Sequence, residues 1–261
     1  MKYAAIQNYI NGQFVPASST LTLPVISPID GSHLSEVPLS TAKDLDEAVK
    51  AAAAAFQIWS RKPIKERAQV FFRYKFLLEK NMDELAKLVQ EENGKTYSEA
   101  VAEVEKSIEL TEFACSLPQL VTGEVLEVSK GVECRTEHVP LGVVASIVPF
   151  NFPSMVPNWT LPNAIALGNC MIMKPSEKVP LSTARLALLL KEAGLPDGVF
   201  NIVNGDSDIV NAICDHPGIE AVSFVGSTKV AKIVYQRATS QFKRALDRKS
   251  TRLNSSHSLP S

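Results

Sequence analysis

Residues 142–178 read GVVASIVPFNFPSMVPNWTLPNAIALGNCMIMKPSEK. Two short apolar runs, at 143–148 and 170–174, flank a longer apolar stretch at 156–167. Runs of this length predict strand, helix and strand, and that order is typical of two parallel strands joined by a crossover helix. The pattern continues, with strands predicted at 200–203 and 221–225 and helices at 180–193, 206–214 and 228–239. The alternation predicts an α/β fold with a buried parallel sheet.

The residues before this stretch predict a different organisation. Asn11 and Gly12 separate two short apolar runs, which predicts a hairpin near the start of the chain. Residues 43–118 have helical periodicity, and Asp44 or Asp46 could open the first helix. We therefore expect one intertwined unit with three parts: a helical front over about 1–130, a hairpin strand over about 131–140, and a βαβ part over about 141–246.

The composition is that of a globular protein and excludes several classes. The chain has 261 residues, of which 45% are hydrophobic and 21% charged, and its net charge is −1. This charge gives no general attraction to nucleic acid or to anionic lipid. Four cysteines are too few for a disulfide scaffold of this length, and no apolar run is long enough to span a membrane. We expect a cytoplasmic protein without a nucleic-acid or membrane partner.

The last fifteen residues, 247–261, read DRKSTRLNSSHSLPS and have no periodicity. They resemble the in-frame translation of a sequencing-library adapter, and the alternative is a natural basic, serine-rich disordered terminus. On the first interpretation the native protein continues beyond residue 246. We then expect the sheet to lack its fifth parallel strand and the helix that covers it. An exposed apolar edge would make the chain marginally stable or prone to aggregate.

Charged residues follow the second strand of the βαβ unit. Because ligands of doubly wound sheets bind at the carboxyl ends of the strands, Lys174 and Glu177 are candidate binding residues. A carboxylate there can accept hydrogen bonds from ribose hydroxyls and repels a 2′-phosphate, which favours NAD over NADP. A neighbouring ammonium can donate to the same sugar. The alternative is a solvated charged loop.

Two further strand ends carry candidate groups. Gly226 and Ser227 follow an apolar strand and open a helix, where free amides and a hydroxyl suit a pyrophosphate. The alternative is an N-cap preceded by a turn glycine. Asn151 lies between two aromatic residues and could donate its amide to an oxyanion, or could be an ordinary turn residue that bonds its own backbone. The chain contains no G-x-G-x-x-G fingerprint.

In combination these motifs resemble the aldehyde dehydrogenase superfamily. The resemblance rests on the order and spacing of the motifs within 147–178 and 221–228, and it covers nearly all of residues 7–246. The runs PFNFP at 149–153, MKPSE at 173–177 and DHP at 215–217 look most like the methylmalonate-semialdehyde dehydrogenase branch, which is CoA-acylating. The resemblance implies a Rossmann-type parallel sheet, incomplete here and preceded by a helical N-terminal segment.

The resemblance also implies roles for particular residues. Lys174 and Glu177 match contacts to the adenosine ribose of NAD, and Ser227, preceded by Gly226, matches a pyrophosphate contact. Phe150 matches a residue that lines the dinucleotide site, and Lys178 stands where the branch usually has arginine. Asn151 matches the amide that holds the oxyanion when a cysteine attacks the aldehyde. Coenzyme A then takes the acyl group, and the full-length form is expected to be a homo-oligomer, a tetramer, to which the hairpin strand contributes.

No nucleophile is assigned in this chain. In the family it lies in a Gly-Gln-x-Cys segment that the sequence does not contain, so the chain as given is expected to be inactive alone and to lack the catalytic domain. We interpret all four cysteines as small hydrophobic residues or spectators, and their spacing does not resemble a zinc site. Two alternatives stay open. One is a hydrolytic aldehyde dehydrogenase of broader range, and the other is a truncated, catalytically dead NAD-binding fragment.

Overall fold

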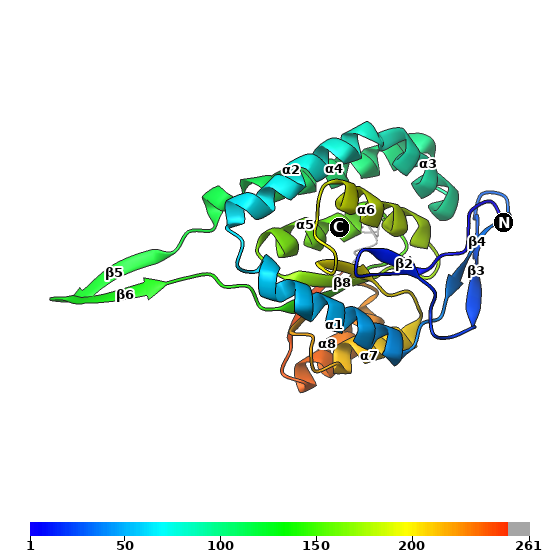
Figure 1. Ribbon diagram of the computed structural model, residues 1–261. Coiled ribbons are helices and arrows are strands. Elements are labelled where there is room, and N and C mark those ends of the chain that lie inside the picture. Colours follow the sequence, from blue (N-terminus) through cyan, green and yellow to red (C-terminus); the bar gives the residue numbers. More distant parts are fainter. Residues whose placement is uncertain (250–261) are drawn as a thin grey trace, which may run out of the picture.

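The computed structural model describes the backbone of residues 1–249 and the side chains of residues 1–246. Its centre is a seven-stranded sheet in the order β11-β10-β7-β8-β9-β1-β2 (Figure 1). The first five strands in that order are parallel, and the last two are antiparallel. The strands are β1 (Asn8–Ile10), β2 (Gln13–Val15), β7 (Val143–Ile147), β8 (Cys170–Lys174), β9 (Phe200–Ile202), β10 (Ala221–Gly226) and β11 (Arg244–Lys249). The predicted α/β class with a Rossmann-type parallel sheet is confirmed.

The two strands of the first βαβ unit form the middle of this sheet. Every residue of β7 and β8 is buried, and their ladder runs in register from Val143 opposite Cys170 to Ile147 opposite Lys174. Both strands are mostly apolar because helices cover both faces of the sheet, and the exceptions are Ser146 and the terminal Lys174. The crossover helix α5 (Met155–Ala166) falls within one residue of the predicted limits.

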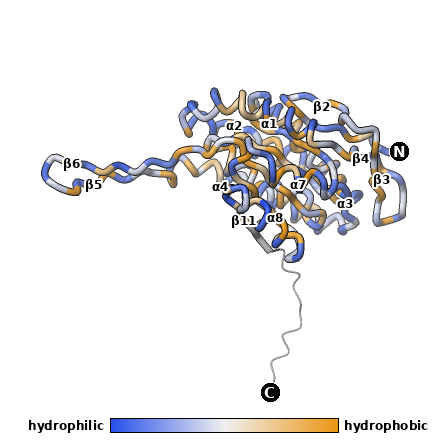
Figure 2. Tube along the Cα trace, turned by 90° about the horizontal axis from the view of Figure 1, so that it is seen from below, coloured by the Kyte–Doolittle hydropathy of each residue, from blue (hydrophilic) through white to orange (hydrophobic). Residues whose placement is uncertain are grey.

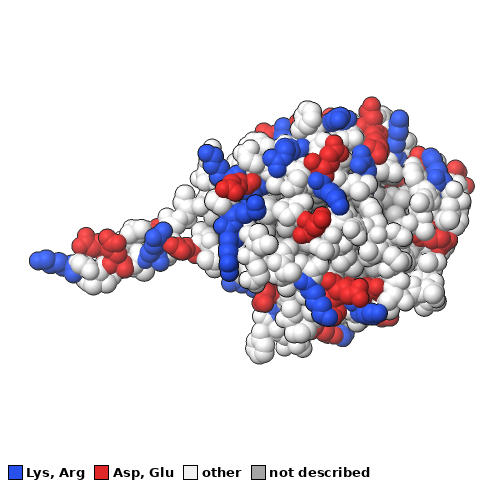
Figure 3. All heavy atoms as spheres, in the orientation of Figure 1, with Lys and Arg blue, Asp and Glu red and all other residues white. Residues whose placement is uncertain are grey.

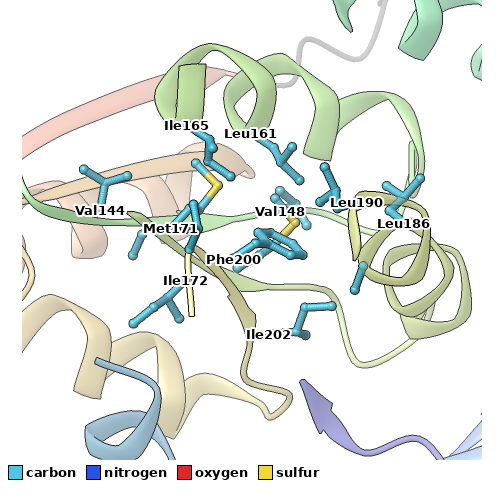
Figure 4. Packing of buried hydrophobic residues seen from close by; sticks show 14 of the residues in the cluster. Val144, Val148, Leu161, Ile165, Met171, Ile172, Leu186, Leu190, Phe200 and Ile202 are labelled. Carbon is cyan, nitrogen blue, oxygen red and sulfur yellow. The ribbon is translucent and has the colours of Figure 1, made fainter. Parts of the chain in front are cut away.

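Two layers of helices enclose the sheet. On one face lie α5 and α6 (Pro180–Glu192), which are covered in turn by α2 (Ile64–Lys80), α3 (Met82–Asn93) and α4 (Tyr97–Leu120) (Figure 1). On the other face lie α1 (Ala42–Trp59), α7 (Ser207–Asp215) and α8 (Thr228–Ser240). Figure 4 shows Leu161 and Ile165 of α5 packed over Met171 and Phe200 of the sheet. The core therefore fixes the strand ends that carry the candidate site.

The strand order defines a topological switch point beside β7. The chain passes from β7 to β8 and β9 on one side, and then crosses to β10 on the other side of β7. In open α/β sheets this arrangement leaves a crevice at the carboxyl ends of the two strands next to the switch. Those ends are the segment that begins at Val148 and the Gly226-Ser227 pair.

The front of the chain contains more strands than the sequence predicts. The opening hairpin is confirmed, with left-handed backbone at Asn11 and Gly12 (φ 50° and 77°). A second hairpin, β3 (Thr22–Ile26) with β4 (His33–Pro38), was not predicted. The first helix is capped by Thr41, and Asp44 lies in its first turn, where its carboxylate accepts a 2.7 Å hydrogen bond from the Thr41 amide. The prediction that Asp44 or Asp46 opens this helix is therefore wrong, because Asp44 supplies the reciprocal half of a capping box.

A long hairpin projects from the body, formed by β5 (Glu124–Ser129) and β6 (Val132–Thr136) (Figures 1 and 2). A hairpin strand was predicted over about 131–140, but Gly131 is a turn residue with φ 76°. The partner strand β5 therefore falls inside the predicted helical front. The turn is formed by Lys130 and Gly131, and glycine adopts this left-handed conformation without a Cβ penalty.

The expectation that the fifth parallel strand is missing is wrong. β11 pairs in parallel with β10, from Arg244 opposite Ala221 to Lys249 opposite Gly226. A ladder is made by main-chain groups that every residue except proline supplies, so the change of composition at residue 247 does not end the strand. An apolar groove of about 490 Å³ remains beside α5, lined in part by Trp159 and Leu246. The rest of the expected non-native tail, residues 250–261, lies outside the described part of the chain.

No helix within residues 1–249 is both long enough and apolar enough to cross a bilayer.

Candidate active site

Lys174 and Glu177 meet where β8 ends. Lys174 is the last residue of β8 and is buried, and its Nζ donates a 3.2 Å hydrogen bond to the Glu177 carboxylate. The Glu177 side chain is 31% exposed, so one end of the pair faces solvent. Burial lowers the pKa of Lys174, and the negative charges of Glu177 and Asp206 oppose that shift. The pair was predicted as two separate contacts, and the structure brings it together as one ion pair.

Gly226 and Ser227 lie at the end of β10, across the switch point from β7. A Cβ on Gly226 would approach Phe224 Cζ to 2.5 Å, so any larger residue here would displace the Phe224 ring. Ser227 is the N-cap residue of α8, yet its side chain makes no capping hydrogen bond. The exposed hydroxyl and the first amides of the helix are therefore available to an anion. The alternative of a serine committed to capping is not favoured.

Phe150 and Lys178 connect the ends of β7 and β8. Phe150 is 51% exposed, and Lys178 Nζ lies 5.0 Å from the centroid of its ring, within range of a cation–π contact. A cavity of about 400 Å³ adjoins them and is lined also by Pro28 and Asn93. These two predicted residues are thus neighbours, although 28 positions separate them in the sequence.

Asn151 is held by its backbone and not by its side chain. Its carbonyl oxygen accepts a 2.7 Å hydrogen bond from Lys95 Nζ, and the carbonyl of Phe150 accepts one of 2.7 Å from Asn93 Nδ2. Within the described residues, no hydrogen bond involves the Asn151 side-chain amide. This geometry disfavours a turn asparagine that bonds its own backbone, and it leaves an amide donor available at the switch point.

The residues at the end of β9 were not predicted as part of the site. Asn204 is buried, and its backbone amide donates 2.8 Å to Asn8 Oδ1, which ties the start of the chain to this loop. Asp206 caps α7, and its charge acts on Lys174. The signal was a strand followed by Asn-Gly-Asp at a helix start, the same kind of pattern that identified the other strand ends. No local sequence pattern predicted that Asn93 and Lys95 would contact the loop after β7.

The four cysteines do not form a nucleophilic site. Burial raises the pKa of Cys115 and Cys214 to about 11 and that of Cys170 to about 12. Their thiols therefore stay protonated near neutral pH, and a thiol is a poor nucleophile. Cys134 is exposed on β6, in the projecting hairpin. No group of three or more potential metal-binding side chains occurs in the described part of the chain.

The fold and the strand-end residues agree with a family comparison. The sequence model of the aldehyde dehydrogenase family matches residues 14–247. The chain belongs to the aldehyde dehydrogenase family. The predicted resemblance to this family is confirmed, and it extends through most of the described residues.

Known relatives narrow the resemblance within the aldehyde dehydrogenases. The chain is 49% identical over 240 residues to malonate-semialdehyde dehydrogenase 1 of Geobacillus thermodenitrificans (strain NG80-2). It is 50% identical over 240 residues to the malonate-semialdehyde dehydrogenase of Lacticaseibacillus casei. Each alignment covers 92% of this chain but only 50% and 49% of the relative. The chain thus spans about half the length of the curated relatives it matches.

Solved structures of aldehyde dehydrogenases have the same fold as this chain. The methylmalonate-semialdehyde dehydrogenase of Oceanimonas doudoroffii superposes with a TM-score of 0.93 and 43% identity, over 95% of this chain and 51% of that one. A variant of aldehyde dehydrogenase C from Pseudomonas syringae, in complex with NAD+ and octanal, superposes with a TM-score of 0.88 and 35% identity. That match covers 94% of this chain and 50% of the other.

Proposed function

We propose that the whole protein is an NAD-dependent semialdehyde dehydrogenase that transfers the acyl group to coenzyme A. Malonate or methylmalonate semialdehyde is the proposed small-molecule substrate. The observation that carries this proposal is the half-buried Lys174–Glu177 ion pair at the end of β8. Across the switch point from it lies Ser227, whose side chain makes no capping hydrogen bond. Identity of 49% and 50% to malonate-semialdehyde dehydrogenases supports this branch over others.

The strand-end residues fit NAD. The exposed face of the Glu177 carboxylate suits two ribose hydroxyls, and its charge disfavours the 2′-phosphate of NADP. Ser227 and the amides at the start of α8 suit the pyrophosphate. Phe150 offers an exposed ring near the β7 end, and the Lys178 ammonium lies over that ring. These side chains bind and orient the dinucleotide in our proposal, and Gly226 lets its backbone approach.

Asn151 supplies the chemical group that this chain can contribute to the reaction. Its free amide would donate a hydrogen bond to the oxyanion that forms when a thiolate adds to the aldehyde. NAD, when bound, accepts the hydride that leaves the former aldehyde carbon. The resulting thioester passes its acyl group to the thiol of coenzyme A, and the enzyme thiolate leaves. We propose that the nucleophilic thiol belongs to the part of the whole protein that this chain does not span.

The whole protein is also proposed to form a homo-oligomer, a tetramer, in which the β5–β6 hairpin takes part. The hairpin carries exposed Val125, Leu126 and Val128 and projects away from the core. An exposed apolar ribbon of this kind is typical of a surface that pairs with another chain.

The test is a coupled assay on the whole protein with malonate and methylmalonate semialdehyde, NAD, and coenzyme A present or omitted. We expect NADH and acyl-CoA to form in equal amounts and only when coenzyme A is present. Rapid acid formation without coenzyme A would instead assign a hydrolytic aldehyde dehydrogenase. NAD binding without turnover of either aldehyde would assign a non-catalytic NAD-binding protein.

A further inference from the structure

Lys95 makes two contacts with the loop that follows β7 and one with a carboxylate of α4. It lies in the connection between α3 and α4, and its side chain is 17% exposed. Its Nζ forms an ion pair with Glu103, donates 2.7 Å to the carbonyl oxygen of Asn151, and lies 3.9 Å from the centroid of the Phe152 ring. A single ammonium thus contacts two consecutive loop residues and one buried carboxylate.

Glu103 holds the other end of the same loop. Its side chain is only 1% exposed, and its Oε1 accepts hydrogen bonds from the backbone amides of Ser154 (2.8 Å) and Met155 (3.1 Å). These are the amides at the start of α5, and Ser154 makes no side-chain cap of its own. Glu103 therefore caps α5 from a distant helix, and it balances the helix dipole with its charge.

The ion pair links the two anchoring points. Lys95 fixes the carbonyl of Asn151, Glu103 fixes the amides three and four residues later, and the two side chains bond each other. The backbone on either side of Asn151 is restrained, while its side-chain amide makes no hydrogen bond within the described residues. The direction of that amide is consequently set through the main chain.

We propose that Lys95 is a positioning residue that acts through Asn151 and aims its amide at the oxyanion. This inference rests on the proposed function of Asn151. Loss of the Lys95 ammonium would free the Asn151 carbonyl and leave the Glu103 carboxylate buried without its counter-charge. The loop would shift, and misplacement of a catalytic donor by about 1 Å can cost roughly 100-fold in rate.

The experiment is a double-mutant cycle in the whole protein, with Lys95→Met, Asn151→Ala and the double variant. We expect Lys95→Met to lower kcat by about 10- to 100-fold while KM for NAD changes by less than about twofold. The double variant should be no slower than Asn151→Ala alone, because the two residues act on the same oxyanion. Lys95→Arg, which keeps the charge and donors, should recover most of the rate.

Lys75→Met is the matched control. Lys75 also pairs with two glutamates, Glu79 and Glu112, and joins α2 to α4 away from the strand ends. Its replacement should leave kcat unchanged. If Lys95→Met is recovered unfolded, Lys95→Gln, which keeps one donor and removes the charge, takes its place in the cycle.

Other outcomes of this cycle would contradict either the role of Lys95 or that of Asn151. Additive effects of Lys95→Met and Asn151→Ala, or an effect of Lys95→Met on KM for NAD alone, would overturn the positioning role. An Asn151→Ala variant with unchanged kcat would instead remove the proposed oxyanion role of Asn151. The two failures are therefore distinguishable.

Discussion

The carboxylate of Glu92 caps the helix that follows the Lys174–Glu177 loop: its Oε2 accepts a 2.7 Å hydrogen bond from the backbone amide of Leu181. Its Oε1 accepts a second bond of 3.0 Å from the amide of Ser182. Glu92 lies near the end of α3 and is 3% exposed. Together with Asn93 and Lys95, it lets residues 92–95 support both the loop after β7 and the start of α6.

Folding stability should depend on pH through Glu92. Burial raises the pKa of this carboxyl from 4.5 to about 7 in the folded protein, while its hydrogen bonds to Leu181 and Ser182 limit the shift. Below pH 4.5 both states hold the proton. As pH rises toward 7, the unfolded chain releases it first, so the native state loses about 3 kcal/mol of relative stability. The free energy of unfolding is therefore higher in acid than near neutral pH.

Urea unfolding of the wild type and of Glu92→Gln at pH 5 and pH 8 checks this prediction. The wild type should lose more stability between the two pH values than the variant, because only the wild type has a titrating group at this position. Equal losses in both proteins would show that Glu92 does not titrate in this range.

Replacement of Glu177 by glutamine should weaken NAD binding. The charge-assisted bonds proposed to the ribose hydroxyls would be lost, which corresponds to about 1.5–3 kcal/mol, or roughly 10- to 100-fold in Kd. Binding of NADP should weaken less, because the repulsion of its 2′-phosphate is removed at the same time. Calorimetric titration of the whole protein with both dinucleotides measures this. Glu192→Gln, a change at the far end of α6, is the control and should leave both affinities unchanged.

Thiol labelling should distinguish one cysteine from the other three. In the 261-residue chain, which has four cysteines, Ellman's reagent at pH 7.5 should find one fast-reacting thiol. This is Cys134, because it is exposed, whereas Cys115, Cys170 and Cys214 are buried and have raised pKa values. The remaining three should react only after unfolding. Cys134→Ser should abolish the fast phase, and two or more fast thiols in the wild type would contradict the described packing.

The apolar hairpin should contribute to assembly of the whole protein. Leu126 on β5 is 64% exposed, and Leu126→Lys places a charge in the middle of that ribbon. We expect the variant to sediment as a smaller species than the wild type at equal concentration. Lys130→Ser at the hairpin turn is the control, since it removes no apolar surface. Figure 3 shows that the hairpin carries charges of both signs, so the effect is expected from the lost apolar contact. Unchanged sedimentation of Leu126→Lys would exclude the hairpin from the interface.

Local patterns were sufficient for four of the five parallel strands and for part of the site. β8 was predicted with its observed bounds because an apolar run flanked by turn residues is a local signal. Lys174 and Glu177 could be identified together because three positions separate them, although the ion pair between them required the structure. Ser227 could be placed because it stands between a strand and a helix, although whether its hydroxyl caps α8 required the structure.

Other features depend on partners that are distant in sequence. Lys95 lies 56 positions from Asn151, and Glu103 lies 51 from Ser154, so no window of local sequence connects them. The β3–β4 hairpin was missed because Pro24 interrupts a strand pattern, and proline is tolerated there on an edge strand. β11 was missed because its composition was taken as a boundary, whereas strand pairing uses the main chain.

The attachment of the first strand to β9 also constrains how the protein is made. Tyr9 of β1 pairs with Ile202, and the Asn11 amide donates to Asn201 Oδ1, 190 positions later. During synthesis at about 5–20 residues per second, the opening hairpin must wait roughly 10–40 s before its partner leaves the ribosome. A two-stranded ribbon alone is marginally stable in water. The nascent chain therefore carries an unpaired β edge at residues 8–15 until β9 has been made, and that edge is a candidate for chaperone contact during the interval.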